Sequence, residues 1–176
     1  MYRTRTYLAG DWDGDSDLIQ TIMKWNDNGY LALDFGDAHE LKQARDNSLN
    51  CSIKKSLSDR LSASKKFVLI VGTHTKTVTK GSCQHCPSYV SYVSNCRRNS
   101  KNFDKRSFVE YECDIAERDY RLHNMKILVI YNSATINKNL CPDILKNIGS
   151  HITGICRNSM GDRVFDYQKI KKAIME

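Results

Sequence analysis

The sequence predicts an α/β fold in which helices cover both faces of a five-stranded parallel sheet, giving a three-layer sandwich. Segments with the apolar pattern of strands alternate along the chain with segments that have the period of amphipathic helices. Two of the strand segments, KFVLIVGT at 66–73 and MKILVIYN at 125–132, are apolar on both faces. Such strands lie between two layers of helices, and parallel neighbours need these helices as crossovers.

The expected elements follow one another from the amino end. TRTYLAG at 4–10 is a short strand, and residues 16–29 form a helix with Ser16 as N-cap and Gly29 as stop signal. YLALDFG at 30–36 is the second strand. The remaining elements are a helix at 49–61 with apolar residues at every fourth position, the strand at 66–73, a helix at 106–120, the strand at 125–132, a short helix at 142–147, a weak strand at 151–155 and a helix at 166–175.

The composition is that of a soluble protein with one sizeable core. The chain has 176 residues, 40% of them hydrophobic and 27% charged, so we expect a single domain over 1–176. No apolar segment is long enough to cross a bilayer, and the amino end has no export signal, which predicts a cytoplasmic protein without membrane contact. The seven cysteines, an odd number, favour reduced thiols over a disulfide framework.

The net charge of +7 is scattered over the chain. Basic residues do not interleave with aromatic residues as they do in proteins that bind single strands, so nucleic-acid binding is not expected. The charge favours an anionic small ligand instead.

Ligands of such folds bind at the carboxyl ends of the strands. The segments to inspect are therefore GDWDGDSD at 10–17, DFGDAHE at 34–40, GTHTKT at 72–77 and the start of the helix at 106–120. An insertion at about 73–105 is far longer than the usual connection between a strand and a helix, and we interpret it as a candidate lid.

These segments exclude several chemistries. The first loop carries four aspartates between Asp11 and Asp17, which would repel the phosphate of a flavin. Thr73 and His74 follow the central strand where a phospho-receiver needs an aspartate, and glycine-rich nucleotide motifs and nucleophile elbows are missing. Three interpretations of the acidic loop are open. It is a solvated turn that caps the next helix, a binding site for sugar hydroxyls, or a site that attracts Mg²⁺.

The cysteines of CQHC at 83–86, with Cys96 nearby, are either half of a zinc site or free thiols. A second C-x-x-C is missing, so no metal site is assigned.

Glu112 falls on the apolar side of the helix at 106–120. At about 100° per residue, it projects between Phe108 and Ala116. A carboxylate that faces a core is costly without partners. The helix is rotated so that Glu112 reaches its edge, Glu112 pairs with a Lys or Arg residue, or the carboxylate serves a site.

Two motifs resemble those of Toll/interleukin-1 receptor (TIR) domains, and more closely the TIR-like domain of the bacterial Thoeris anti-phage system. The first is LSASKKF at 61–67, where a helix, a serine and a basic residue precede an apolar strand; the second is SFVEYE at 107–112, which ends on Glu112. The resemblance runs from about residue 4 to 155. It implies the flavodoxin-like, TIR-like strand order 2-1-3-4-5, whereas the insertion with KGSCQHC departs from the family pattern.

The resemblance implies cleavage of the bond between nicotinamide and ribose in NAD⁺, by hydrolysis or by cyclisation to a cyclic ADP-ribose-type signal for a downstream effector. Glu112 corresponds to the catalytic glutamate of active members, NAD⁺ is the substrate rather than a cofactor, and homo-oligomers are expected. Trp12 is a candidate for stacking on a base and His74 for reaching a phosphate. The residues that we assign to substrate binding are Asp11, Trp12, Asp13, Phe35, Thr73, His74 and Ser107.

Two other functions are open. A non-catalytic TIR-like adaptor that acts by self-association needs an exposed apolar patch, and DFGDAHE at 34–40 is mostly polar, which favours the enzyme. An enzyme similar to nucleoside 2-deoxyribosyltransferases shares the α/β order and a glutamate but needs a nucleophile placed for covalent attack.

Overall fold

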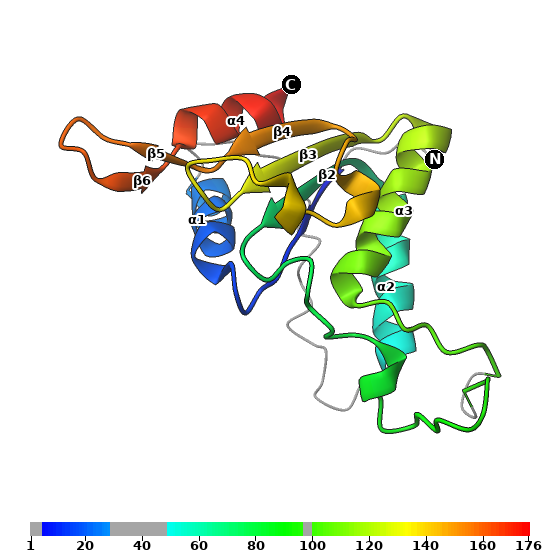
Figure 1. Ribbon diagram of the computed structural model, residues 1–176. Helices are drawn as coiled ribbons and strands as arrows, with labels where there is room; N and C mark the ends of the chain where they lie inside the picture. Colours follow the sequence, from blue (N-terminus) through cyan, green and yellow to red (C-terminus); the bar gives the residue numbers. More distant parts are fainter. Residues whose placement is uncertain (1–4, 29–48, 97–99) are drawn as a thin grey trace.

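A parallel sheet forms the centre of the fold. The computed structural model describes residues 5–28, 49–96 and 100–176. Within them four strands form one parallel sheet in the order β1-β2-β3-β4 (Figure 1): β1 (Arg5–Ala9), β2 (Ser64–Val71), β3 (Lys126–Tyr131) and β4 (Ser150–Thr153). The parallel sheet is thus confirmed for four strands, in the relative order expected. The fifth strand, predicted at 30–36, lies outside the described residues.

Helices cover both faces of this sheet, as the sequence predicts. α1 (Ser16–Asp27) and α4 (Tyr167–Met175) pack on one face, and α2 (Asn50–Ser62) and α3 (Phe108–His123) pack on the other (Figure 1). None of the helices in the described parts of the chain is long and apolar enough to cross a membrane.

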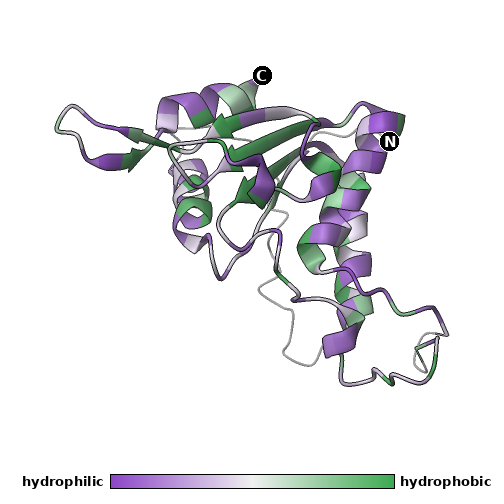
Figure 2. Ribbon diagram, in the orientation of Figure 1, coloured by the Kyte–Doolittle hydropathy of each residue, from purple (hydrophilic) through white to green (hydrophobic). Residues whose placement is uncertain are grey.

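The residues of β2 explain why its sequence is apolar on both faces. Phe67, Leu69 and Val71 belong to the core shared with α2 and α3, whereas Val68 and Ile70 belong to the core shared with α1 and α4. Figure 2 shows β2 and β3 among the most hydrophobic parts of the molecule. Because burial of one such side chain contributes about 1.5–3 kcal/mol, these two cores hold the sheet between its helices.

The ends of three helices differ from the prediction. Ser16, predicted as an N-cap, is the first helical residue of α1, and Asp15 precedes it. α3 continues beyond the helix expected at 106–120 and ends at Asn124, whose left-handed φ of 54° stops the helix. The short helix expected at 142–147 is a 3-10 helix at Asp143–Leu145.

A β-hairpin that the sequence analysis did not predict follows β4. β5 (Ile155–Arg157) and β6 (Arg163–Phe165) pair antiparallel, and Figure 1 shows the hairpin extending away from the sheet. The side-chain oxygen of Asn158 accepts hydrogen bonds from the N–H groups of Met160 and Asp162 at 3.0 and 2.8 Å, which closes the turn. Strands of three residues are too short to show an alternating pattern.

The segment between β2 and α3 is the insertion predicted at about 73–105. Its described residues contain a 3-10 helix at Cys83–His85 and an isolated bridge between Asn95 and Asn102. The backbone N–H of Phe108 donates to the Lys80 carbonyl at 2.8 Å, so the insertion is tied to the first residue of α3. Its role as a lid and the single-domain organisation of the chain stay predictions.

Candidate functional site

A pocket of about 200 Å³ lies where the carboxyl end of β1 meets the amino end of α3. The loop after β1, the buried face of α2, the insertion and the first turns of α3 each contribute to its wall. The lining residues are Gly10, Asp11, Trp12, Asp13, Ile53, Leu57, Val78, Lys80, Phe108, Val109 and Glu112.

A capping box fixes the start of α3. The Ser107 hydroxyl accepts a hydrogen bond from the Glu110 N–H at 3.1 Å, and the Glu110 carboxylate accepts one from the Ser107 N–H at 2.7 Å. The Glu110 carboxylate is thereby hydrogen-bonded to the backbone at the exposed end of the helix. Glu112, two residues later, lies on the buried side with 4% of its surface exposed, as the helical period predicts.

Glu112 has a specific hydrogen-bond partner in the sheet. The hydroxyl of Tyr7, a fully buried residue of β1, donates to Glu112 Oε1 at 2.5 Å. Burial raises the pKa of Glu112 to about 7, although the hydrogen bond from Tyr7 acts in the opposite direction. Burial and the neighbouring carboxylate raise the pKa of Tyr7 well above its usual value, so the phenol remains a donor. Glu112 therefore takes up and releases its proton near neutral pH.

Lys80 and Asp13 face each other at the pocket. Lys80 Nζ lies 2.9 Å from Asp13 Oδ2, and both side chains are exposed. Gly81, with φ of 96°, lets the ring of Phe108 lie against the insertion, because a Cβ here would meet that ring at 2.4 Å. The insertion thus supplies both a cation and a close-packed wall.

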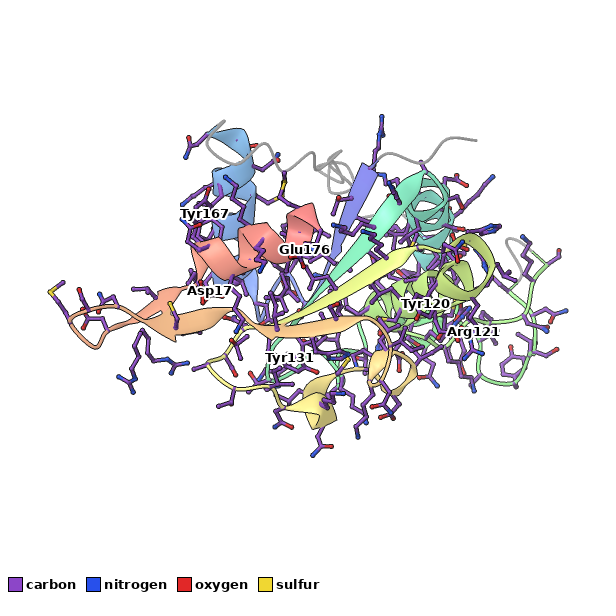
Figure 3. The ribbon with its side chains drawn as sticks, turned by 90° about the horizontal axis from the view of Figure 1, so that it is seen from above. Asp17, Tyr120, Arg121, Tyr131, Tyr167 and Glu176 are labelled. Atoms are coloured by element: carbon purple, nitrogen blue, oxygen red, sulfur yellow. The ribbon has the colours of Figure 1, made fainter. Side chains whose placement is uncertain are left out.

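A second polar cluster joins the carboxyl ends of three strands. The carboxylate of Asp15 accepts hydrogen bonds from the Thr75 hydroxyl at 3.2 Å and from the Asn132 amide at 3.1 Å. Asn132 also donates to Asp17, which Figure 3 labels near the start of α1. A Cβ at Gly72 would meet the Asp15 carboxylate at 1.8 Å, so only glycine fits there. Burial raises the pKa of Asp15, and this carboxyl serves to hold the strand ends together.

The structure brings together four of the predicted site residues, namely Asp11, Trp12, Asp13 and Glu112. The remaining predicted residues do not line this pocket. Thr73 and His74 are exposed in the loop after β2, Ser107 is buried as the cap of α3, and Phe35 lies outside the described residues.

Two polar side chains of the pocket region, Tyr7 and Lys80, were not predicted as site residues. Tyr7 is 105 positions from Glu112 in the chain, so no sequence spacing connects them, and the available signal was a hydroxyl among the buried positions of β1. The sequence does not distinguish Lys80 from the other lysines of the chain. The glycine that follows it, Gly81, was the available signal of a turn at this position.

The cysteine turn and the acidic loop do not form a metal site in the structure. Within residues 5–28, 49–96 and 100–176, no three His, Cys, Asp or Glu side chains are placed to hold one ion. Cys83 and Cys96 are buried, and Cys86 is half-buried.

The first part of the chain matches a known family. Residues 7–80 match the family model of the Thoeris protein ThsB, TIR-like domain. Over these residues the chain is similar to the TIR-like domain of a Thoeris protein. It begins within β1 and ends at Lys80, so it includes both partners of the Lys80–Asp13 ion pair. No curated protein matches the chain.

The ThsB match covers less than half of the chain and stops before α3. It therefore includes Tyr7 but not Glu112. The contact between these two residues connects the matched segment with α3, which lies outside the match.

Proposed function

We propose that this protein is an NAD⁺-consuming enzyme of the TIR-like type, which cleaves the bond between nicotinamide and ribose. Its product, ADP-ribose or a cyclic form of it, would act as the signal of an anti-phage response. The observation that carries the proposal is the buried carboxyl of Glu112 in the wall of a pocket at the strand ends.

The charge of the pocket fits the reacting half of NAD⁺. Its lining includes the carboxyls of Asp11, Asp13 and Glu112 and the ammonium group of Lys80. The nicotinamide ring of NAD⁺ is a cation, and cleavage moves positive charge onto the ribose, as in glycoside hydrolysis. A carboxylate held out of bulk water stabilises this charge more as it develops on the sugar, which is what accelerates the step.

The pKa of Glu112, about 7, is compatible with this role. A carboxyl with this pKa is partly protonated at neutral pH. A cationic nicotinamide beside it favours the ionised form, and the Tyr7 hydroxyl stabilises the same form by donating a hydrogen bond. Nicotinamide leaves as a neutral molecule, so the reaction needs no strong general acid.

The size of the pocket supports binding of only part of the dinucleotide inside it. Sites for whole drug-sized ligands usually have about 300–1,000 Å³, and this pocket has about 200 Å³. It therefore suits the nicotinamide–ribose half, with Trp12 as part of the wall against the flat ring. The diphosphate then lies outside, where Lys80 is the nearby cation. Binding would exchange the Lys80–Asp13 pair for contacts of Lys80 with phosphate and of Asp13 with sugar hydroxyls.

The test is release of nicotinamide from NAD⁺ by the purified chain, with infected-cell extract as a second condition. We expect Glu112→Gln to lower the rate about 10²–10³-fold, the range seen when a group that stabilises transition-state charge is removed. Glu110→Gln is the matched control, since glutamine also completes a capping box. An active Glu112→Gln enzyme contradicts the proposal. A wild type that is silent in both conditions favours the adaptor.

Lys80→Gln tests the phosphate contact in the same assay. We expect KM for NAD⁺ to rise about 3–10-fold with little change in kcat, because a partly exposed ion pair with phosphate is worth about 1 kcal/mol. Lys76→Gln is the control, since Lys76 pairs with Asp143 at 2.7 Å and does not line the pocket. An equal rise in KM for Lys80→Gln and Lys76→Gln would show that the net charge of the protein, rather than a contact of Lys80 with phosphate, determines the affinity for NAD⁺.

A further inference from the structure

The C-x-x-C turn of the insertion lies outside the pocket described above and takes no part in the proposed reaction. Cys83 and Cys86 both line a larger cavity of about 940 Å³ between α2 and the segment that precedes α3. All seven cysteines lie in described parts of the chain, and all are free thiols.

The geometry of the turn brings these two thiols to the same side. Residues Cys83–His85 form a 3-10 helix, and the N–H of Cys86 donates to the Cys83 carbonyl at 3.0 Å. Side chains three residues apart eclipse each other in such a helix, and a turn closed by this bond has its end Cα atoms within about 7 Å. A disulfide needs Cα atoms about 4.4–6.8 Å apart. The backbone is thus already folded as a Cys83–Cys86 bond requires.

A metal site is not completed around the pair. Structural zinc takes four ligands, and no three His, Cys, Asp or Glu side chains of the described residues are placed to share an ion. Cys96 lines the same cavity, and His85 lies within the turn, but neither joins the pair in such a group. Two neighbouring thiols without further ligands are suited to dithiol chemistry instead.

Contacts from both sides hold the turn in place. The N–H of Cys83 donates to the Asp104 carbonyl at 2.9 Å, and the side-chain amide of Asn50 donates to the Ser82 carbonyl at 2.8 Å. The turn is therefore anchored to α2 and to the segment before α3. A bond between the two thiols would add a link within four residues and leave these anchors unchanged.

The two thiols differ in access. Cys83 is buried, with 8% of its surface exposed, and Cys86 is half-buried. Burial raises the pKa of the Cys83 thiol, and the greater exposure of Cys86 makes its sulfur the one that a reagent meets first.

We propose that Cys83 and Cys86 form a redox-active dithiol that closes to an intramolecular disulfide by exchange with a small-molecule disulfide. The Cys86 thiolate attacks one sulfur of the reagent, the reagent's S–S bond breaks, and one thiol leaves. Cys83 then loses its proton and attacks the Cys86 sulfur, which releases the second thiol. The chain loses two protons and two electrons, and the disulfide reagent takes them up and is reduced to two thiols.

The test uses the full reduced chain, incubated with oxidised glutathione and then alkylated under denaturing conditions for mass spectrometry. We expect two fewer alkylated thiols than in the reduced chain, and a peptide in which Cys83 is linked to Cys86. Cys86→Ser should abolish the Cys83–Cys86 linked peptide, because oxidised glutathione can then form no disulfide within the turn. Cys51→Ser and Cys96→Ser should retain the linked peptide. The readout is independent of NAD⁺ cleavage, so its failure and that of the proposed function are distinguishable.

Three results overturn the dithiol. One is full alkylation of the wild type after oxidation, and the second is a linked peptide that joins Cys83 to Cys96. The third is one equivalent of zinc in the purified chain that Cys86→Ser removes. Circular dichroism of each variant establishes that it is folded, and the wild-type result alone decides the matter if Cys86→Ser does not fold.

Discussion

Glu112 illustrates how one side chain can be costly for folding and useful for a site. The residue is 4% exposed, and the Tyr7 hydroxyl is the hydrogen-bond donor that the sheet supplies to its carboxyl. Full desolvation without this donor would raise the pKa further and leave the carboxyl protonated at neutral pH. Tyr7 is therefore a positioning residue, since it acts on the sugar only through Glu112.

Replacing Tyr7 by phenylalanine tests this role. The change removes a hydrogen bond to an ionised group, which is worth about 1.5–3 kcal/mol and corresponds to about 1–2 pH units. We expect the rising limb of kcat against pH to move up by this amount, so that activity lost at pH 7 returns at pH 8–9. Nicotinamide release over pH 5–9 measures it. A uniform loss at all pH values would show a packing defect instead.

At the scale of elements, the amino end of α3 sets the position of the site. Ser107 and Glu110 fix where the helix begins. The hydrogen bond from the Phe108 N–H to the Lys80 carbonyl ties that end of the helix to the insertion. The helix then directs Glu112 toward β1. A cap at this position therefore affects both the stability of the helix and the placement of the carboxyl.

We expect Ser107→Ala to lower the free energy of unfolding by about 1 kcal/mol and to lower kcat for nicotinamide release as well. Asp166→Ala is the matched control. The Asp166 carboxylate caps α4 by accepting from the Lys169 N–H at 3.1 Å, and α4 packs on the opposite face of the sheet. Asp166→Ala should lower the free energy of unfolding by a similar amount and leave kcat unchanged. Urea unfolding and the activity assay measure the two effects; a parallel fall of kcat in both variants would contradict the argument.

At the scale of the whole molecule, the sequence predicts what depends on local periods. The apolar runs of β2 and β3 indicate strands buried on both sides, and the helical period of α3 predicts the inward direction of Glu112. Contacts between distant segments have no such signal. The Tyr7–Glu112 hydrogen bond and the Lys80–Asp13 pair are made by the sheet and the insertion, and β5 and β6 are too short for an alternating pattern.

The pH dependence of unfolding belongs to this scale, because the whole fold excludes water from Glu112. Its pKa is about 7 in the folded protein, against a usual value of 4.5. A pKa raised by folding stabilises the protein below the lower value and costs stability as pH rises through the higher one. The cost amounts to about 3 kcal/mol when the group is fully ionised.

Glu112→Gln keeps an acceptor for Tyr7 but has no charge to bury, so it should gain stability relative to the wild type as pH rises. We expect the difference in the free energy of unfolding to grow by about 2–3 kcal/mol between pH 5 and pH 8. Glu110→Gln, at the exposed cap, should show little change in its difference over the same range. Urea unfolding of the three proteins at both pH values measures this. If Glu112→Gln differed equally from the wild type at both pH values, folding would not raise the pKa of Glu112, and the carboxyl would not be held out of bulk water as the proposal requires.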